Sequence, residues 1–137
     1  MTVELTEPQQ ALISALLGDE FEQGRNALRY QQAGGDRFCC LGVGCEVYRR
    51  MTGLGRWDTA IYGSIPFIDS AGRTNSTTMP TEVAEFFGLP DGNPEIYMGK
   101  RAVTLNDGNL WNFRQIAEAF RETFLRINAE KLTKDTN

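Results

Sequence analysis

The sequence predicts an α+β fold: a single compact domain of about four helices with short antiparallel hairpins. Three observations predict it. Apolar residues recur at helical spacing in several segments, short runs of strand-forming residues flank glycine turns, and no repeat or linker divides the chain. With 137 residues, of which 41% are hydrophobic and 23% charged, the chain can form a packed core. We therefore treat 1–137 as one domain, and we expect residues 1–5 and 131–137 to fray.

The first two helices are predicted from caps and apolar faces. Thr6 and Gln9 have the spacing of a capping box, and the helix that they begin is expected to end at Gly18. A second helix is expected over 40–52, where two glycines indicate that another element packs closely against it. Its apolar face is formed by Cys40, Val43, Val47 and Met51.

Short strands and loops are predicted around and after the second helix from turn residues and alternating patterns. In chain order we expect a hairpin turning at 33–36, strands at 57–62 and 65–68, a mobile polar loop at 69–78, and a hairpin joining 95–98 to 101–105. These pieces are too short to form one large sheet, so they are expected to lie around the helices.

Two further helices complete the predicted fold. Pro80 opens a short helix that ends at Gly88, and Asn112 caps the last helix with Gln115 at the capping-box position. The last helix carries a stripe formed by Phe113, Ile116, Ala117, Phe120, Phe124 and Ile127. Because a small chain has little interior for so many rings, with Trp111 beside them, we expect a homodimer or higher oligomer. Alternatively, the stripe is the core of a monomer.

The residue types present exclude several functions. The chain has no histidine, so mechanisms that need an imidazole base or ligand are absent. No apolar run is long enough to span a membrane, and acidic residues replace the basic start of an export signal. The thiols of Cys39, Cys40 and Cys45 fit reduced, buried side chains in a cytoplasm, the alternative being a reactive thiol. We expect no metal site and no cofactor.

Charge is distributed unevenly along the chain. Residues 1–23 hold five acids and no base, whereas residues 24–57 hold six arginines, no lysine and two acids. The planar fork of donors in arginine matches phosphate and carboxylate groups, which favours anion recognition by this segment. Alternatively, these arginines pair with the acidic segment on a solvated face. Glu46 and Arg50 are expected to form an ordinary supporting pair on one side of a helix.

Candidate ligand-binding residues lie in the arginine segment and in the turn before the last helix. Arg25 and Arg56 each follow a glycine and are candidate phosphate contacts, and Trp57 is a candidate stacking surface. Asn106 and Asp107 can read a base edge or ribose hydroxyls. A net charge of −4 argues against a polynucleotide, so a small nucleotide is the expected ligand. Alternatively, Trp57 is core, Arg25 pairs with a nearby acid and Asn106 only shapes its turn.

Three segments carry a resemblance to a known family: FCCLGVGCEV at 38–47, MPTEVAEFFGLP at 79–90 and AVTLNDGNLWNFRQIAEAF at 102–120. Together with Gln23-Gly24-Arg25, they resemble a widespread family of small uncharacterised proteins of bacteriophages and prophages. The resemblance implies a phage-borne accessory protein in the host cytoplasm that counters host defence, and it carries over no catalytic residue. Gly44 departs from the family pattern, which often has a larger apolar residue there.

The residues and the resemblance together predict a non-enzymatic protein that sequesters a small anionic nucleotide signal. A second hypothesis is a protein–protein inhibitor of a host defence enzyme. Its contact face would be acidic and formed by Glu4, Glu7, Asp19, Glu20 and Glu22. A third is a small enzyme acting on a nucleotide, which is disfavoured because a cysteine nucleophile would lack a histidine base.

Overall fold

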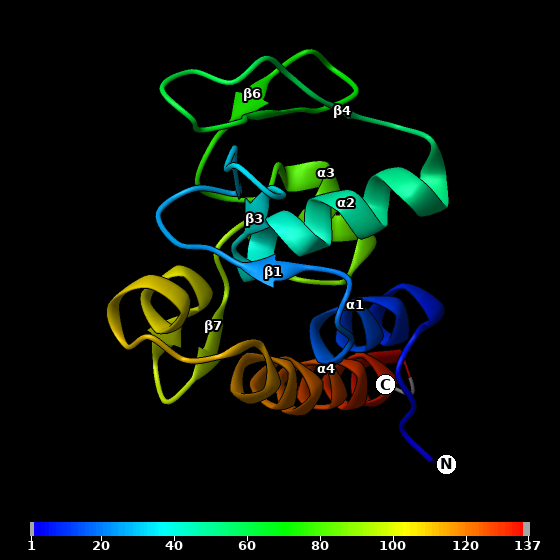
Figure 1. Cartoon of the computed structure of the whole chain (residues 1–137). Coiled ribbons are helices and arrows are strands. Elements are labelled where there is room, and N and C mark those ends of the chain that lie inside the picture. The colour runs from blue at the N-terminus through cyan, green and yellow to red at the C-terminus, as the bar shows by residue number, and fades with distance from the viewer. Residues whose placement is uncertain (1, 136–137) are drawn as a thin grey trace.

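Helices form the centre of the fold, and three small sheets lie around them (Figure 1). The computed structural model describes residues 2–135 and confirms the predicted α+β class. The helices are α1 (Glu7–Leu17), α2 (Cys40–Thr52), α3 (Thr81–Phe86), the π-helical turn η1 (Thr104–Gly108) and α4 (Phe113–Asp135). Met1 and residues 136–137, which belong to the ends expected to fray, lie outside the described residues, whereas 131–135 continue α4.

The sheets are built from strands of two or three residues. The strands are β1 (Glu22–Gln23), β2 (Arg29–Tyr30), β3 (Arg37–Phe38), β4 (Arg56–Trp57), β5 (Phe67–Ile68), β6 (Thr74–Asn75), β7 (Glu95–Tyr97) and β8 (Lys100–Arg101). They pair in the orders β1-β3-β2, β4-β5-β6 and β7-β8. All pairs are antiparallel except β1 with β3, which is parallel.

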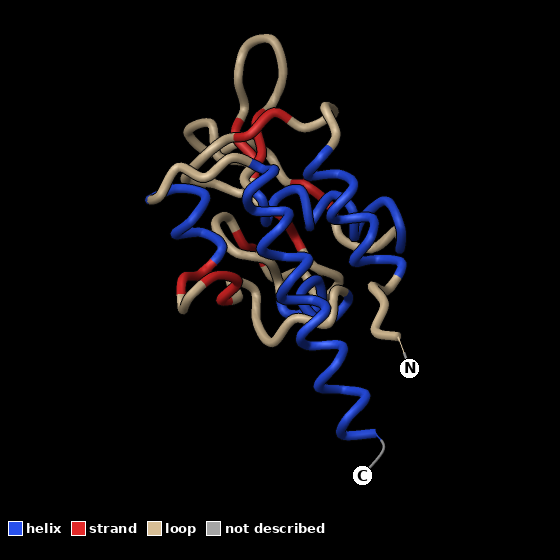
Figure 2. Tube along the Cα trace, turned by 90° about the horizontal axis from the view of Figure 1, so that it is seen from below, coloured by secondary structure: helices blue, strands red, loops and turns tan. Residues whose placement is uncertain are grey.

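Helix α1 lies between α2 and α4 and contacts both. The sheet β4-β5-β6 lies on the far side of α2 from α4 (Figure 1). Figure 2 shows the C-terminal part of α4 extending past the rest of the molecule. The core contains fully buried aromatic side chains from three elements or their flanks, namely Phe67, Phe87, Phe120 and Phe124. Phe113 is buried as well, so the interior of one chain accommodates these rings, as in the alternative of a monomer core.

Local capping chemistry sets the helix ends where the sequence predicts them. Thr6 and Gln9 form the reciprocal capping box of α1, and Asn112 and Gln115 bond each other's backbone N–H at the start of α4. Helix α2 covers 40–52 as predicted, and Gly53 ends it in the left-handed region. A Cβ at Gly42 would lie 1.7 Å from the carbonyl oxygen of Leu28, which explains a glycine inside this helix.

Three loop and strand predictions are wrong in part. The strand expected over 57–62 ends at Trp57, and the polar stretch 69–78 contains β6, which pairs with β5. The strand expected over 101–105 ends at Arg101, where the chain turns into η1. In η1 the buried side chain of Asn106 forms hydrogen bonds with distant segments. These long-range contacts outweigh the local preference for a strand.

Candidate functional site

Turn η1 brings together three of the five predicted ligand-binding residues. Arg25 Nη1 donates a hydrogen bond to the main-chain carbonyl of Asn106 at 3.0 Å. The side-chain Nδ2 of Asn106 donates to Asp107 Oδ1 at 2.7 Å. The predicted proximity of the arginine segment and the turn before α4 is therefore present for Arg25, Asn106 and Asp107.

The side chain of Asn106 is 0% exposed and all its hydrogen-bonding positions are occupied. Its Oδ1 accepts from Gln23 Nε2 at 2.9 Å and from the Cys40 backbone N–H at 3.3 Å. Its Nδ2 also donates to the Gly24 carbonyl at 2.9 Å. The amide therefore joins β1, η1 and the start of α2, and it offers no free group to a ligand.

Arg56 and Trp57 lie elsewhere, on β4. The Trp57 ring makes edge-to-face contacts with Phe38 and Phe67, whose centroids lie 5.9 and 5.0 Å away. Its Nε1 donates to Glu46 Oε1 at 2.9 Å. Trp57 therefore packs against the core, and its neighbour Arg56 is exposed with no ion pair to any residue of the described part of the chain.

Glu46 forms the predicted i,i+4 ion pair with Arg50, and it is in addition a buried acceptor of further hydrogen bonds, which the sequence did not indicate. The residue is 6% exposed and accepts hydrogen bonds from Arg49, Arg50 and Trp57 at 2.7–2.9 Å. Burial by itself would raise the pKa of Glu46. The hydrogen bonds from Arg49, Trp57 and Arg50 outweigh burial and lower the pKa to about 2. Arg50 also bonds Glu20, so this cluster ties β4, α2 and the segment after α1 together.

The three cysteines are buried and reduced. Burial raises the pKa of Cys39 to about 12 and raises the pKa of Cys40 and Cys45 as well. The sulfur of Cys39 accepts a hydrogen bond from the Gly42 N–H at 3.4 Å and so caps α2. These thiols are poor nucleophiles because the reactive thiolate is disfavoured.

A cleft beside Arg25 has the chemistry of an anion site. We name it the arginine cleft; its volume is about 350 Å³ and its lining residues are Gly24, Arg25, Asn26, Ala27, Tyr30, Gln32, Arg37 and Ser64. Two guanidinium groups, two amides, a hydroxyl and a phenol line it, with no carboxylate among them. Among residues 2–135, the one acid paired with a lining arginine is Glu22, whose carboxylate lies 3.6 Å from Arg37 Nη2.

The hairpin formed by β2 and β3 positions the cleft. Its register places Tyr30 directly opposite Arg37 across the two strands. The Tyr30 ring packs against Gly63, where a Cβ would lie 2.7 Å from the ring Cζ, and Tyr30 remains 42% exposed. Arg37 and Tyr30 were not predicted as site residues. The turn predicted at 33–36 could have indicated them, because a hairpin that turns there brings its two flanking strands, and so these two residues, together.

Comparison with known proteins places the chain in a family. The model of a family described as a domain of unknown function (DUF8296) matches residues 6–124. The chain belongs to the DUF8296 family. The match includes every residue that lines the arginine cleft. No curated protein and no solved structure matches the chain.

Within residues 2–135, no helix is both long and apolar enough to cross a membrane. In the same part of the chain, no three Cys, Asp or Glu side chains are grouped as ligands for a metal ion. We base a binding hypothesis on the arginine cleft because of the donor groups that line it.

Proposed function

We propose that this protein is encoded by a bacteriophage and counters host defence in the host cytoplasm by sequestering a small anionic nucleotide without catalysis. The arginine cleft is the observation that carries the proposal. It presents two guanidinium groups and a partly exposed aromatic ring on a chain whose net charge is −4. Local charge, rather than net charge, attracts an anion to such a cleft.

The arginines, the aromatic ring and the amides that line the arginine cleft have matching groups on a nucleotide. Arg25 and Arg37 are suited to phosphate oxygens, since a guanidinium offers a planar fork of donors. Arg25 is held by one hydrogen bond to the Asn106 carbonyl, which leaves its other donors for a ligand. Tyr30 is suited to stacking on a base, and the amides of Asn26 and Gln32 can read a base edge.

The size and charge of the cleft favour a small ligand over a polynucleotide. A volume of about 350 Å³ is at the lower end of the range for small-molecule sites. Two arginines neutralise few phosphates, whereas polynucleotide affinity depends on neutralising many. The proposed binding residues are therefore Arg25, Arg37 and Tyr30. Asn106, which bonds the adjacent Asp107, holds Arg25 in position through its main-chain carbonyl.

The chemistry of the side chains near the cleft favours binding over catalysis. The buried thiols of Cys39 and Cys40 have raised pKa values, and the chain has no histidine to activate them. The carboxylate of Asp107 accepts a hydrogen bond from Asn106, consistent with a structural role. The phage origin rests on the sequence resemblance, chiefly the FCCLGV motif at 38–43.

An acidic contact face for a host protein has less support. Two of its five proposed carboxylates already interact with arginines of the same chain: Glu20 with Arg50, and Glu22 with Arg37. Glu4, Glu7 and Asp19 are exposed, which is common for surface acids. We therefore rank a protein–protein inhibitor below nucleotide sequestration.

The proposal is tested by analysing what the protein carries out of an infected host with an active defence. The purified protein is denatured, and the released small molecules are identified by mass spectrometry. We expect the wild type to release a nucleotide, Arg37→Gln to release much less, and the control Arg56→Gln, an exposed arginine outside the cleft, to match the wild type. Equal amounts from Arg37→Gln and the wild type would contradict the proposed site.

A further inference from the structure

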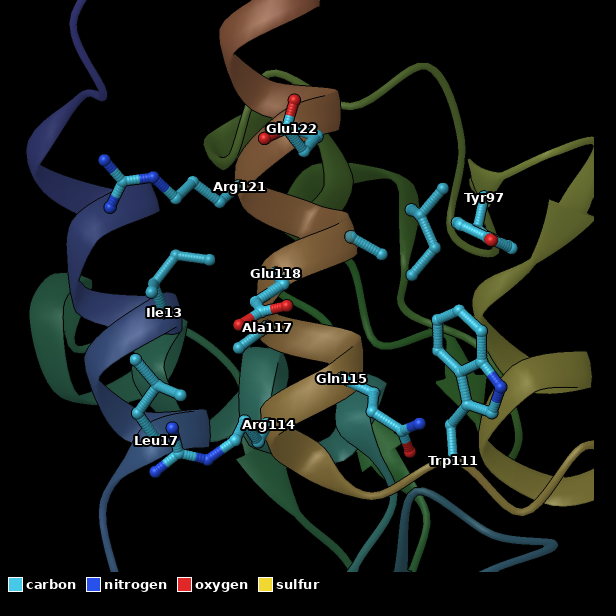
Figure 3. A pocket seen from close by; sticks show the side chains of 12 residues that line it. Ile13, Leu17, Tyr97, Trp111, Arg114, Gln115, Ala117, Glu118, Arg121 and Glu122 are labelled. Atoms are coloured by element: carbon cyan, nitrogen blue, oxygen red, sulfur yellow. The ribbon is translucent and has the colours of Figure 1, made fainter.

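A broad groove follows the exposed side of α4, on a part of the surface that the arginine cleft does not use. Its volume is about 780 Å³, and Figure 3 shows α4 between two apolar walls. Ile13 and Leu17 of α1 form one wall. Tyr97 and Trp111 form the other, with their ring centroids 4.8 Å apart.

Strained and exposed apolar residues flank the aromatic wall. Met98 follows Tyr97 and is 84% exposed, with φ at 46°. Leu110 precedes Trp111 and is 62% exposed, with φ at 57°. The left-handed backbone of a non-glycine residue costs about 1–2 kcal/mol. A large apolar side chain that stays in water also lacks the stabilisation that burial would give. Such residues beside an open groove mark a contact surface.

The charges on α4 within the groove indicate which partner fits it. Four exposed charged side chains lie along this face: Arg114, Glu118, Arg121 and Glu122 (Figure 3). None of them forms an ion pair within residues 2–135. Two positive and two negative charges sum to zero, so a uniformly acidic or basic partner would meet as much repulsion as attraction.

We infer that this groove binds a second copy of the chain, with the two α4 helices antiparallel across a two-fold axis near Glu118. Residues 114 and 122 lie equally far from Glu118 along the helix. A two-fold axis there places Arg114 of each copy opposite Glu122 of the other. Arg121 of each copy lies within one turn of the axis and can neutralise Glu118 of the other. At the edges of this contact, the apolar walls and the side chains of Met98 and Leu110 are then removed from water.

Charge exchange tests this arrangement, because it predicts which variants dimerise. Mass is measured by sedimentation equilibrium over the micromolar range, with circular dichroism as the check on folding. We expect a wild-type dimer. We expect Arg114→Glu or Glu122→Arg to weaken it at least about tenfold, since each places like charges opposite one another twice. The double variant should regain the wild-type dissociation constant, and so should a mixture of the two single variants.

Two further variants separate the groove from the rest of α4. Lys131→Glu alters an exposed charge of α4 outside the groove, so the dimer should keep its wild-type dissociation constant. Leu110→Ser removes an exposed apolar group beside the aromatic wall and should weaken the dimer while the fold is retained. A monomeric wild type throughout the range would overturn the inference, as would a dimer that is unaffected by Arg114→Glu and Glu122→Arg.

Discussion

Replacing Asn106 with alanine is expected to destabilise the fold rather than to remove a ligand contact alone. The amide of Asn106 joins β1, η1 and α2 from a fully buried position. In Asn106→Ala, the Cys40 N–H loses the acceptor that it bonds in the native fold, and the Gly24 carbonyl loses the Asn106 donor. Both backbone groups belong to buried residues, so water replaces these hydrogen bonds poorly.

The size of the effect follows from these two groups. A buried polar group left without a partner costs about 1–3 kcal/mol, so the two together cost about 2–6 kcal/mol. A domain of this size has a free energy of unfolding of about 5–15 kcal/mol, so the loss is a large fraction of it. Asn106→Asp should destabilise further, because it replaces the donor that faces the Gly24 carbonyl and the Asp107 carboxylate with an acceptor.

Urea denaturation followed by circular dichroism measures this loss. The matched control is Asn109→Ala, an exposed asparagine at the end of the same turn, which should change stability by less than about 0.5 kcal/mol. An Asn106→Ala protein as stable as this control, yet unable to bind nucleotide, would refute the structural role. It would instead support direct contact between the Asn106 amide and the ligand.

Three further predictions follow from packing and burial. In urea denaturation, Gly42→Ala should lower the free energy of unfolding by about 3 kcal/mol or more, because its Cβ meets the Leu28 backbone. Gly44→Ala should lower it less, because its Cβ meets the sulfur near the end of the flexible Met79 side chain. Because the pKa of Glu46 is about 2 in the fold against an ordinary 4.5, its stabilisation is complete above pH 4.5 and is lost toward pH 2. Allowing for the partly solvated arginines, acid titration of the wild type should show about 1–2 kcal/mol more loss than Glu46→Gln over that range. Native Cys39 should alkylate far more slowly than in urea, and rapid labelling of the folded protein would contradict its raised pKa.

Local chemistry made much of the fold predictable. The capping boxes at Thr6 and Asn112 involve residues three apart, so the sequence displays both partners. The extent of α2 follows from its apolar face and from Gly53 after it. Each of these elements is specified by neighbours in sequence, and for that reason their boundaries are confirmed.

Long-range contacts account for what the sequence did not reveal. Apart from the adjacent Asp107, the side-chain partners of Asn106 lie 66–83 residues away, so nothing in its own segment predicts η1 or its complete burial. Glu46 and Trp57 meet eleven residues apart, which a helix-face rule does not anticipate. The arginine cleft depends on the approach of Gly63 to Tyr30, a contact between the hairpin and a loop that follows β4.

The most direct test of nucleotide sequestration is calorimetric titration of the folded, ligand-free protein with a panel of cyclic and ADP-ribose-type nucleotides. We predict heat from one class of nucleotide at one site per chain. Tyr30→Ala should weaken that binding by about 1–3 kcal/mol through lost stacking, while Arg56→Gln should bind as the wild type does. The absence of heat from every nucleotide, with the protein shown to be folded and free of carried-over ligand, would contradict the arginine cleft as a nucleotide site.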